Sequence, residues 1–462
     1  MHYTDRHLYA LLEMQQMLHR GISAGVYSET CAVVMGKATG MNYKFENQVD
    51  EFKNEFLKVW WNTSAEFPAF DRIYSPERQR SAERKTDSVV EQLLAEVRVN
   101  PGNIERNSSA WGARIRNLLG VIGDEILELG GGGAEALLAG GYCKVTSDFI
   151  DRARSFDSSI KTTEILQAMR NAWIMNCIQV LLDRKVEFTP ALFAYSMLYP
   201  YTDNYLDSME VRLEEKLLYG DRFKLALEGK QVNAKNPYEA KIFRLVGMIE
   251  AQYARESFPE VYGSLLEIHD AQQRSLRQQK GLLSPYESDI PGISFAKGGS
   301  SVLADAFLIN GSLTEAQARF MFGFGIFLQL ADDAQDVAVD LKNRHMTMFS
   351  QTADKWKLDS VTSKLVNFMF NLIDNDQCFH TPGMKAQKRL IRDSCMLLLI
   401  CAAANNPSKY SKGFISRLER HSPISFGYLR RLYKRAGKEY YQLFEKNETV
   451  PMDSIIARAL AT

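Results

Sequence analysis

Hydrophobic positions along the chain recur mainly at steps of three and four residues, which is the period of an amphipathic helix. The clearest example is segment 163–182, whose apolar side chains at that spacing are Ile165, Met169, Trp173, Cys177 and Val180. Breakers such as Gly140-Gly141 and Asn236-Pro237 separate these stretches, and alternating β-type runs are scarce. Ser312, with Glu315 three residues on, is predicted to cap one helix. The pattern predicts an all-α fold, a bundle of long helices.

A stripe of carboxylates is the sharpest chemical feature. On a helix over 327–340, one face carries Gln329, Asp332, Asp333, Asp336 and Asp340. Like charges one turn apart repel, and the flanking residues are apolar, so we expect the stripe to lie partly inside the protein and to need a cation. Mg²⁺ suits such a site because it takes carboxylate oxygens and leaves positions for substrate phosphates. The alternative is a solvated acidic face, the commoner meaning of carboxylates on a helix.

Two segments upstream strengthen the metal interpretation. A second acidic helical face carries Asp203, Asp207 and Glu210. Asp203 precedes Asp332 by 129 residues, which leaves room for several helices between them, so the two acidic patches could face each other across a bundle. Acids favoured by a helix N-terminus are the alternative there. Lys297 sits beside small residues, Gly298 to Ser301, that would let an anion approach backbone N–H groups, although a plain loop would explain it equally.

These motifs resemble a known family. The run from Gln329 to Asp336, QLADDAQD, resembles the FQ-x-x-DD-x-x-D signature of trans-prenyltransferases and related class I terpene synthases, with Leu328 in place of the Phe. Asp203 to Asp207, DNYLD, resembles the first aspartate-rich motif of that superfamily and the DYLD motif of bacterial class IB terpene synthases. Lys297 resembles the diphosphate-contacting lysine that precedes the second motif. The resemblance covers roughly residues 163–351.

The resemblance implies an isoprenoid synthase-type helical bundle with a central apolar cavity and about three Mg²⁺ at its mouth. The metal ligands it implies are Asp203, Asp207, Asp332, Asp333, Asp336 and Asp340, all but the last also counted as catalytic. The diphosphate-binding residues it implies are Lys297, Arg344 and His345, the last two being otherwise a charge pair at a helix C-terminus. The candidate cavity residues, otherwise plain core, are Trp173, Tyr195, Tyr199, Phe322 and Phe324.

The predicted activity is that of a terpene synthase, a lyase that ionises a C15 to C25 prenyl diphosphate and cyclises or quenches the allylic cation in a pocket without water. Chain elongation needs a second anion site, typically an Arg-Arg pair after the first motif, and here only Arg212 follows, with acids after it. Elongation and head-to-head condensation therefore rank lower. A non-catalytic helical interaction protein is the alternative from another class.

The composition of the chain limits the kinds of partner and the cellular compartment that we expect. Lys+Arg and Asp+Glu are both 56, which argues against a whole-protein field that would collect nucleic acid. The six cysteines are scattered and read as reduced thiols, and the longest apolar run, 396–404, is too short to span a membrane. We expect a soluble cytoplasmic protein with no transmembrane segment, and a homodimer as in many enzymes of the resembled family. The expected division is 1–110, a helical extension of unknown role, and 111–462, the class I isoprenoid synthase domain.

Overall fold

The computed structural model describes residues 45–98, 108–128, 141–207, 211–276, 278, 287–379, 384–440 and 452–460. All regular elements in these ranges are helices, which confirms the predicted all-α class. The first half of the described chain contains α2 (Phe45–Asn62), α3 (Pro76–Arg98), α5 (Ser108–Val121), the π-helix η1 (Ile122–Ile126), α7 (Tyr142–Phe156), α8 (Thr162–Leu181), α9 (Pro190–Asp207), α10 (Leu213–Leu227), α11 (Pro237–Gln252) and α12 (Pro259–Ser275). The second half contains α13 (Ile290–Asn310), α14 (Glu315–Gln335), α15 (Val337–Asn343), α16 (Met348–Lys355), α17 (Asp359–Asp374), α18 (Met384–Asn405), the 3-10 helix η3 (Pro407–Lys409), α19 (Lys412–Glu419), α20 (Phe426–Tyr440) and α21 (Met452–Leu460).

Local sequence explains several helix boundaries. The helix predicted over 163–182 is α8, displaced by one residue. Asn236 caps α11 by accepting a hydrogen bond from the backbone N–H of Glu239, and Pro237 occupies the first turn. The cap predicted at Ser312 was wrong: α14 begins after Thr314, whose hydroxyl accepts from the N–H of Gln317 in a capping box. Thr314 offers the same chemistry two residues later.

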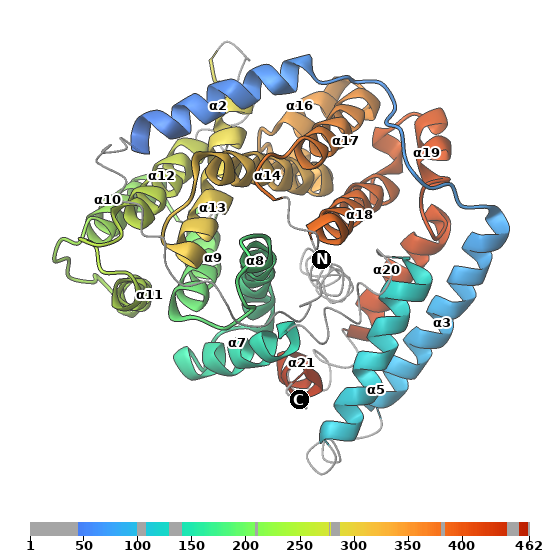
Figure 1. Ribbon diagram of the computed structural model, residues 1–462, viewed down its shortest axis with the longest axis horizontal. Coiled ribbons are helices and arrows are strands. Elements are labelled where there is room, and N and C mark those ends of the chain that lie inside the picture. Colours follow the sequence, from blue (N-terminus) through green and yellow to red (C-terminus); the bar gives the residue numbers. More distant parts are fainter. Residues whose placement is uncertain are drawn as a thin grey trace, which may run out of the picture.

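The helices surround α8, with α2 along one edge of the molecule and α3 with α5 along another (Figure 1). They enclose one large hydrophobic cluster, to which both ends of the described chain contribute. On α2, for example, Phe52 and Phe56 lie 5.8 and 6.1 Å from the ring of Phe322. Helix α2 belongs to the segment predicted as an N-terminal extension, and its inward side chains are part of the same core as those of α14.

The last described helix is fixed to the bundle by charge. Asp453 of α21 is fully buried and accepts hydrogen bonds from Nε and Nη2 of Arg154 on α7, each 2.7 Å long. Thr162 donates to the same carboxylate. A bidentate pair with a third donor satisfies most of the oxygen lone pairs of a buried carboxylate, so α21 and α7 are held in one arrangement.

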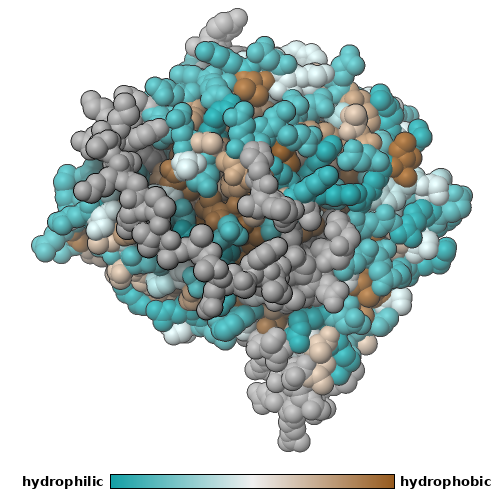
Figure 2. All heavy atoms as spheres, in the orientation of Figure 1, coloured by the Kyte–Doolittle hydropathy of each residue, from teal (hydrophilic) through white to brown (hydrophobic). Residues whose placement is uncertain are grey.

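Two further expectations concern the chain as a whole. None of the described helices is long and apolar enough to cross a membrane. The cysteines in the described ranges, namely Cys143, Cys177, Cys378, Cys395 and Cys401, are free thiols, as predicted. Seen from one face, the molecule has a hollow near its middle where hydrophobic residues lie within a mainly hydrophilic surround (Figure 2).

Candidate functional site

The predicted carboxylate helix is divided in two. Helix α14 ends at Gln335, and Asp336 leaves helical geometry, with φ −88° and ψ 6°, before α15 begins. Hydrogen bonds cross the break, because the N–H of Asp336 donates to the carbonyl of Asp332 and the N–H of Asp340 to that of Asp336, both over 2.9 Å. The aspartates therefore stay on consecutive turns, although the axis is interrupted between Asp333 and Asp340.

The aspartates differ in burial. Asp333 is 5% exposed and Asp340 8% exposed, whereas Asp336 is half-buried and Asp332 is exposed. Oδ1 of Asp333 accepts a 2.9 Å hydrogen bond from Nε2 of Gln329, but among the described residues its Oδ2 has no hydrogen-bond partner. The expectation that the stripe lies partly inside the protein is confirmed. Its innermost oxygen is a buried acceptor with unused capacity.

A histidine lies against the inner carboxylates. Nδ1 of His345 lies 3.4 Å from Oδ1 of Asp340, whose Oδ2 accepts a 3.3 Å hydrogen bond from Thr347. Burial acts to lower the pKa of His345, but its hydrogen bond with Asp340 and the negative charge of that residue outweigh burial and raise the pKa. Burial, followed by the charge of Asp340, raises the pKa of Asp333 to about 8. Without a metal ion, a proton therefore occupies Asp333 at neutral pH.

Lys297 reaches this cluster from inside a helix rather than from a loop. It lies in the middle of α13, so the backbone N–H groups of its neighbours belong to that helix, and the expected use of the glycines to admit an anion was wrong. They serve helix packing instead. A Cβ added at Gly298 would lie 2.5 Å from both the Cβ of Gln329 and the carbonyl oxygen of Gly325. The side chain of Lys297 is nevertheless close enough for its charge to oppose protonation of His345.

Helix α9 approaches α13 in an antiparallel register. Asn171 of α8 donates to Asp305 of α13 over 2.9 Å and to Ser196 of α9 over 3.3 Å. Farther along α9, the hydroxyl of Tyr199 bonds that of Ser301, which lies four residues before Asp305.

Position 203 lies one turn after Tyr199 on α9, and Lys297 lies one turn before Ser301 on α13, so both follow the last hydrogen-bonded contact of the two helices in the same direction. The side chains of Asp203 and Asp207 lie outside the described residues, as does all of Glu210, so their predicted role as ligands stays a prediction. The helix that carries the first motif thus ends next to the helix that carries the lysine.

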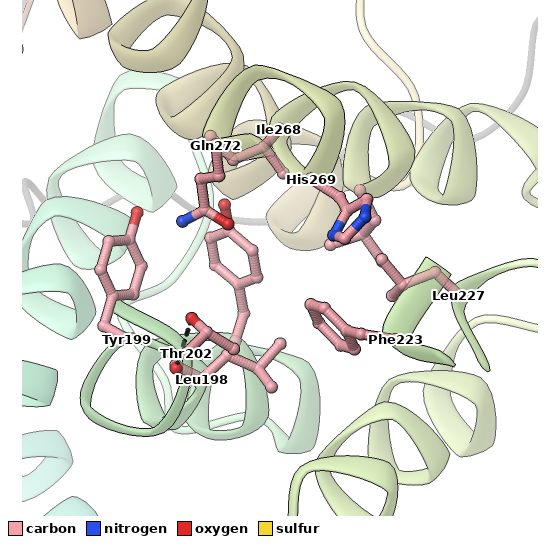
Figure 3. Close-up of a pocket in the computed structure, with 10 residues that line it drawn as sticks. Leu198, Tyr199, Thr202, Phe223, Leu227, Ile268, His269 and Gln272 are labelled. Atoms are coloured by element: carbon pink, nitrogen blue, oxygen red, sulfur yellow. Dashed lines mark hydrogen bonds between the residues drawn. The ribbon is translucent and has the colours of Figure 1, made fainter. Parts of the chain in front are cut away.

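A pocket lies between α9, α10 and α12 (Figure 3). The cavity is small, about 20 Å³, which is room for roughly one water molecule, and the rest of the depression is open to solvent. The residues that line it are Tyr195, Leu198, Tyr199, Thr202, Phe223, Leu227, Leu265, Ile268, His269 and Gln272. Tyr195 and Tyr199 were predicted to line a cavity, and they also bond α13 through Ser301.

The other three predicted lining residues are not part of this pocket. Trp173 donates from Nε1 to the hydroxyl of Thr146, 3.1 Å away. Phe322 packs on α2, and Phe324 stacks between Phe320 and Phe327. All three are core residues, which was the alternative reading of their spacing.

The pocket and the carboxylates share one end of the bundle. Just beyond α12, the carbonyl of Gln278 accepts a 3.0 Å hydrogen bond from the N–H of Met346, the residue after His345. Nε2 of Gln278 donates to Ser294 of α13 over 3.3 Å. The end of α12 therefore holds both α13 and the segment that carries His345. On α9, Thr202 lines the pocket one position before Asp203.

Sequence reasoning did not single out His269 or Gln272. His269 is buried and lies 5.4 Å from Phe223, ring centroid to ring centroid, and burial lowers its pKa to about 4. A neutral imidazole thus faces the pocket at neutral pH. The available signal was the helical spacing of Leu265, Ile268, His269 and Gln272, which places polar residues on an otherwise apolar face.

Arg344 is separate from this cluster. It ends α15 in the left-handed conformation, with φ 56°, and its side chain is exposed. His345, next in sequence, turns inward to Asp340. Of the two residues predicted to cover a diphosphate, the structure brings only His345 to the carboxylates.

The donor chemistry suits a hard divalent cation. Asp333 and Asp340 offer buried carboxylate oxygens, and the partnerless Oδ2 of Asp333 is the kind of atom that Mg²⁺ would satisfy. The described residues alone do not form a group of three or more His, Cys, Asp or Glu side chains able to hold a metal ion. Further ligands would come from the end of α9 and from substrate.

Comparison with protein-family models and with curated protein sequences gives no match for this chain. The interpretation of the site therefore depends on the motifs and on their arrangement in the fold.

Proposed function

We propose that this protein is a Mg²⁺-dependent class I terpene synthase that ionises a prenyl diphosphate. Two packing contacts support the proposal. Helix α14, with buried Asp333 and Asp340, packs on α13, which carries Lys297, and α9, whose last turns carry Asp203 and Asp207, is hydrogen-bonded to α13 through Tyr199 and Ser301. Within the described ranges, Asp333 is buried and its Oδ2 has no hydrogen-bond partner, which a stripe exposed to solvent would not explain.

The charged residues of the site would have two roles in this reaction: carboxylates would bind the metal ion, and basic side chains would contact the diphosphate. Bound Mg²⁺ would supply the electrophile that neutralises the departing diphosphate. Asp333 and Asp340 would hold it with Asp336 and Asp332, and Asp203 with Asp207 from the opposite helix. Lys297, and His345 when it carries a proton, would place positive charge beside these carboxylates, where the diphosphate oxygens would lie. Thr347 fixes Asp340, which in turn orients His345.

The chemistry of the pocket lining, rather than its size of about 20 Å³, supports its assignment to the organic half of the substrate, and the pocket would have to widen to admit a prenyl chain. Its walls are aromatic and aliphatic side chains, and the edge-to-face pair of Tyr195 and Tyr199, with ring centroids 5.7 Å apart, presents π-electrons that stabilise a carbocation. Its few polar groups, Thr202, His269 and Gln272, set orientation. We propose a C15 to C25 prenyl diphosphate as the substrate, a cyclised or quenched product, and a cytoplasmic homodimer as the working form.

The test is incubation of the purified protein with geranyl, farnesyl, geranylgeranyl and geranylfarnesyl diphosphates, each with Mg²⁺ or with a chelator. Released pyrophosphate and extracted products are measured. A metal-dependent hydrocarbon or alcohol from one substrate supports the proposal. A longer diphosphate that forms only with added isopentenyl diphosphate would mean chain elongation, and two joined prenyl chains would mean head-to-head condensation. No reaction in any tube would favour a non-catalytic helical protein.

Variants locate the chemistry. Asp332→Ala and Asp336→Ala should each abolish Mg²⁺-dependent pyrophosphate release while the melting temperature stays near that of the parent, since neither side chain is deeply buried. Asp151→Ala removes an exposed aspartate from α7, a helix that carries none of the motifs, and is the matched control. Unchanged turnover in the first two variants would refute the assignment of the metal site.

A further inference from the structure

Two tryptophans are exposed to an unusual degree. Trp61, at the end of α2, is 66% exposed, and Trp356, between α16 and α17, is 67% exposed. The other three tryptophans, Trp60, Trp111 and Trp173, are buried. Large aromatic side chains left in water lose the free energy that burial would give, so two such exposed residues in one chain call for an explanation.

Local structure explains how each indole comes to lie outside. The inward stripe of α2 is Phe52, Phe56 and Trp60, at steps of four. Trp61 follows Trp60 by one residue, about 100° around the helix, and so falls off that stripe. Trp356 caps α16, and the chain reverses there so that Leu358 can bury itself and donate its N–H to the carbonyl of Lys409.

The two indoles both lie near the N-terminal half of α17. Lys364, in the second turn of α17, donates to the backbone carbonyls of Trp60 and Trp61, and its Nζ lies 5.6 Å from the ring centroid of Trp61. Trp356 lies just before the start of the same helix, eight residues upstream of Lys364. Figure 1 shows α16 and α17 beside the C-terminal end of α2, and the linker after α2 running past α17 to α19.

Basic side chains surround the indoles. Lys357 is exposed and donates to the carbonyl of Ser408, and Lys412, at the start of α19, is exposed. In the described part of the chain, neither these two nor Lys364 forms an ion pair with an acid. Of the nearby acids, Asp359 is engaged by the N–H of Ser411 over 2.9 Å, whereas Asp354 and Glu66 are exposed, and the carbonyl of Glu66 accepts a hydrogen bond from Asn367 of α17. We call Trp61, Trp356, Lys357, Lys364 and Lys412 the tryptophan face.

We propose that the tryptophan face docks on the surface of a lipid bilayer that contains anionic lipid. Indole rings partition to the level of the headgroups because they are apolar with one polar N–H, and each nearby lysine adds electrostatic attraction to an anionic surface. The indoles are separated by lysines rather than joined into one apolar patch, which suits a layer of headgroups better than the dry core of a protein interface. Neither the metal site nor the proposed reaction enters this inference.

The experiment uses the full chain and vesicles of phosphatidylcholine alone or mixed with phosphatidylglycerol. Binding is measured by flotation and by intrinsic fluorescence, since only the two exposed tryptophans can meet lipid. We expect binding to the mixed vesicles, a blue shift of the emission, quenching by brominated acyl chains and loss of binding at high salt. The double variant Trp61→Ser with Trp356→Ser should bind about tenfold more weakly, and Lys357→Glu with Lys412→Glu at least fivefold more weakly.

Matched controls separate the face from general stickiness. Leu217→Ser with Leu218→Ser removes exposed apolar side chains from α10, and Lys230→Glu with Lys235→Glu reverses charge on the loop before α11. Both should bind like the parent, and every variant should melt near the parent temperature. Absence of flotation with either vesicle, equal binding to neutral and anionic vesicles, or parental binding by the tryptophan variant would each overturn the proposal.

Discussion

The contact between α13 and α14 provides the sharpest test of how the fold builds the site. A Cβ added at Gly325 would lie 2.1 Å from the carbonyl oxygen of Gly298 and 3.0 Å from the Cα of Gly299. Carbon and oxygen in contact need about 3.3 Å, so Gly325→Ala forces the two helices apart by about 1 Å. Overpacking of this kind lowers the free energy of unfolding by about 3 kcal/mol, and the higher helix propensity of alanine raises it by about 1 kcal/mol. We therefore expect a net decrease in the free energy of unfolding of about 2 kcal/mol.

Two assays follow from that displacement. For a chain of 462 residues, the expected loss lowers the melting temperature by about 2 °C, which calorimetry resolves. Turnover should suffer far more, about a hundredfold, because Lys297 and the carboxylates of α14 move relative to each other by about 1 Å. Gly247→Ala is the matched control: it lies in the interior of α11, and a Cβ added there meets no atom within 4 Å. Gly247→Ala should raise the free energy of unfolding by about 1 kcal/mol and leave turnover unchanged. A Gly325→Ala protein as stable as the control would refute the packing argument.

Three other predictions rest on single carboxylates. In the metal-free protein, the pKa of Asp333 is raised to about 8, so its contribution to stability is full below about pH 4 and is lost as the pH rises toward 8. The loss in free energy of unfolding is on the order of 4 kcal/mol by pH 7. Asp333→Asn should flatten the dependence of the melting temperature on pH, and a parent curve that is already flat would contradict this. Burial opposes ionisation of Asp157, but hydrogen bonds, the largest from Lys241, outweigh burial and lower the pKa, so the contribution of Asp157 to stability is present above about pH 4 and lost in acid. Asp157→Asn should therefore lower the melting temperature at pH 7, and its difference from the parent should narrow as the pH falls below 4. A difference that stays constant with pH would contradict this reasoning. Asp453→Ala leaves the charge of Arg154 without its buried partner, so it should lower the free energy of unfolding, measured by chemical denaturation, by about 3 kcal/mol. A loss below about 1 kcal/mol would show that α21 is not held by this pair.

The elements of the fold were predictable where the helical period was long and the breakers were strong. Helix α8 was found to within one residue for that reason. The capping residue of α14 was misplaced because Ser312 and Thr314 offer the same chemistry, and only the tertiary position of the helix decides between them. The break at Asp336 was missed because every residue from Gln329 to Asp340 is compatible with a continuous helix.

The role of the glycines around Lys297 illustrates a different limit. Small residues beside a lysine suggest a loop that admits an anion, and the same residues inside a helix suggest close packing. The sequence held a clue in Gly325 on the partner helix, since small residues on two helices allow their backbones to approach. Which pair meets which depends on the crossing of α13 and α14, and no local pattern specifies that.

The adjacent aspartates of the second motif show how fold and chemistry combine. In sequence, Asp332 and Asp333 are equivalent letters, but successive residues of a helix point about 100° apart, so only one of them can face inward where α14 meets α13. Asp333 takes that position, is buried beside Gln329 and retains an oxygen without a partner, while Asp332 stays exposed. In the proposed metal site, Asp333 would hold the cation away from water and Asp332 would meet it at the surface. That asymmetry arises from helix geometry and packing rather than from the spelling of the motif.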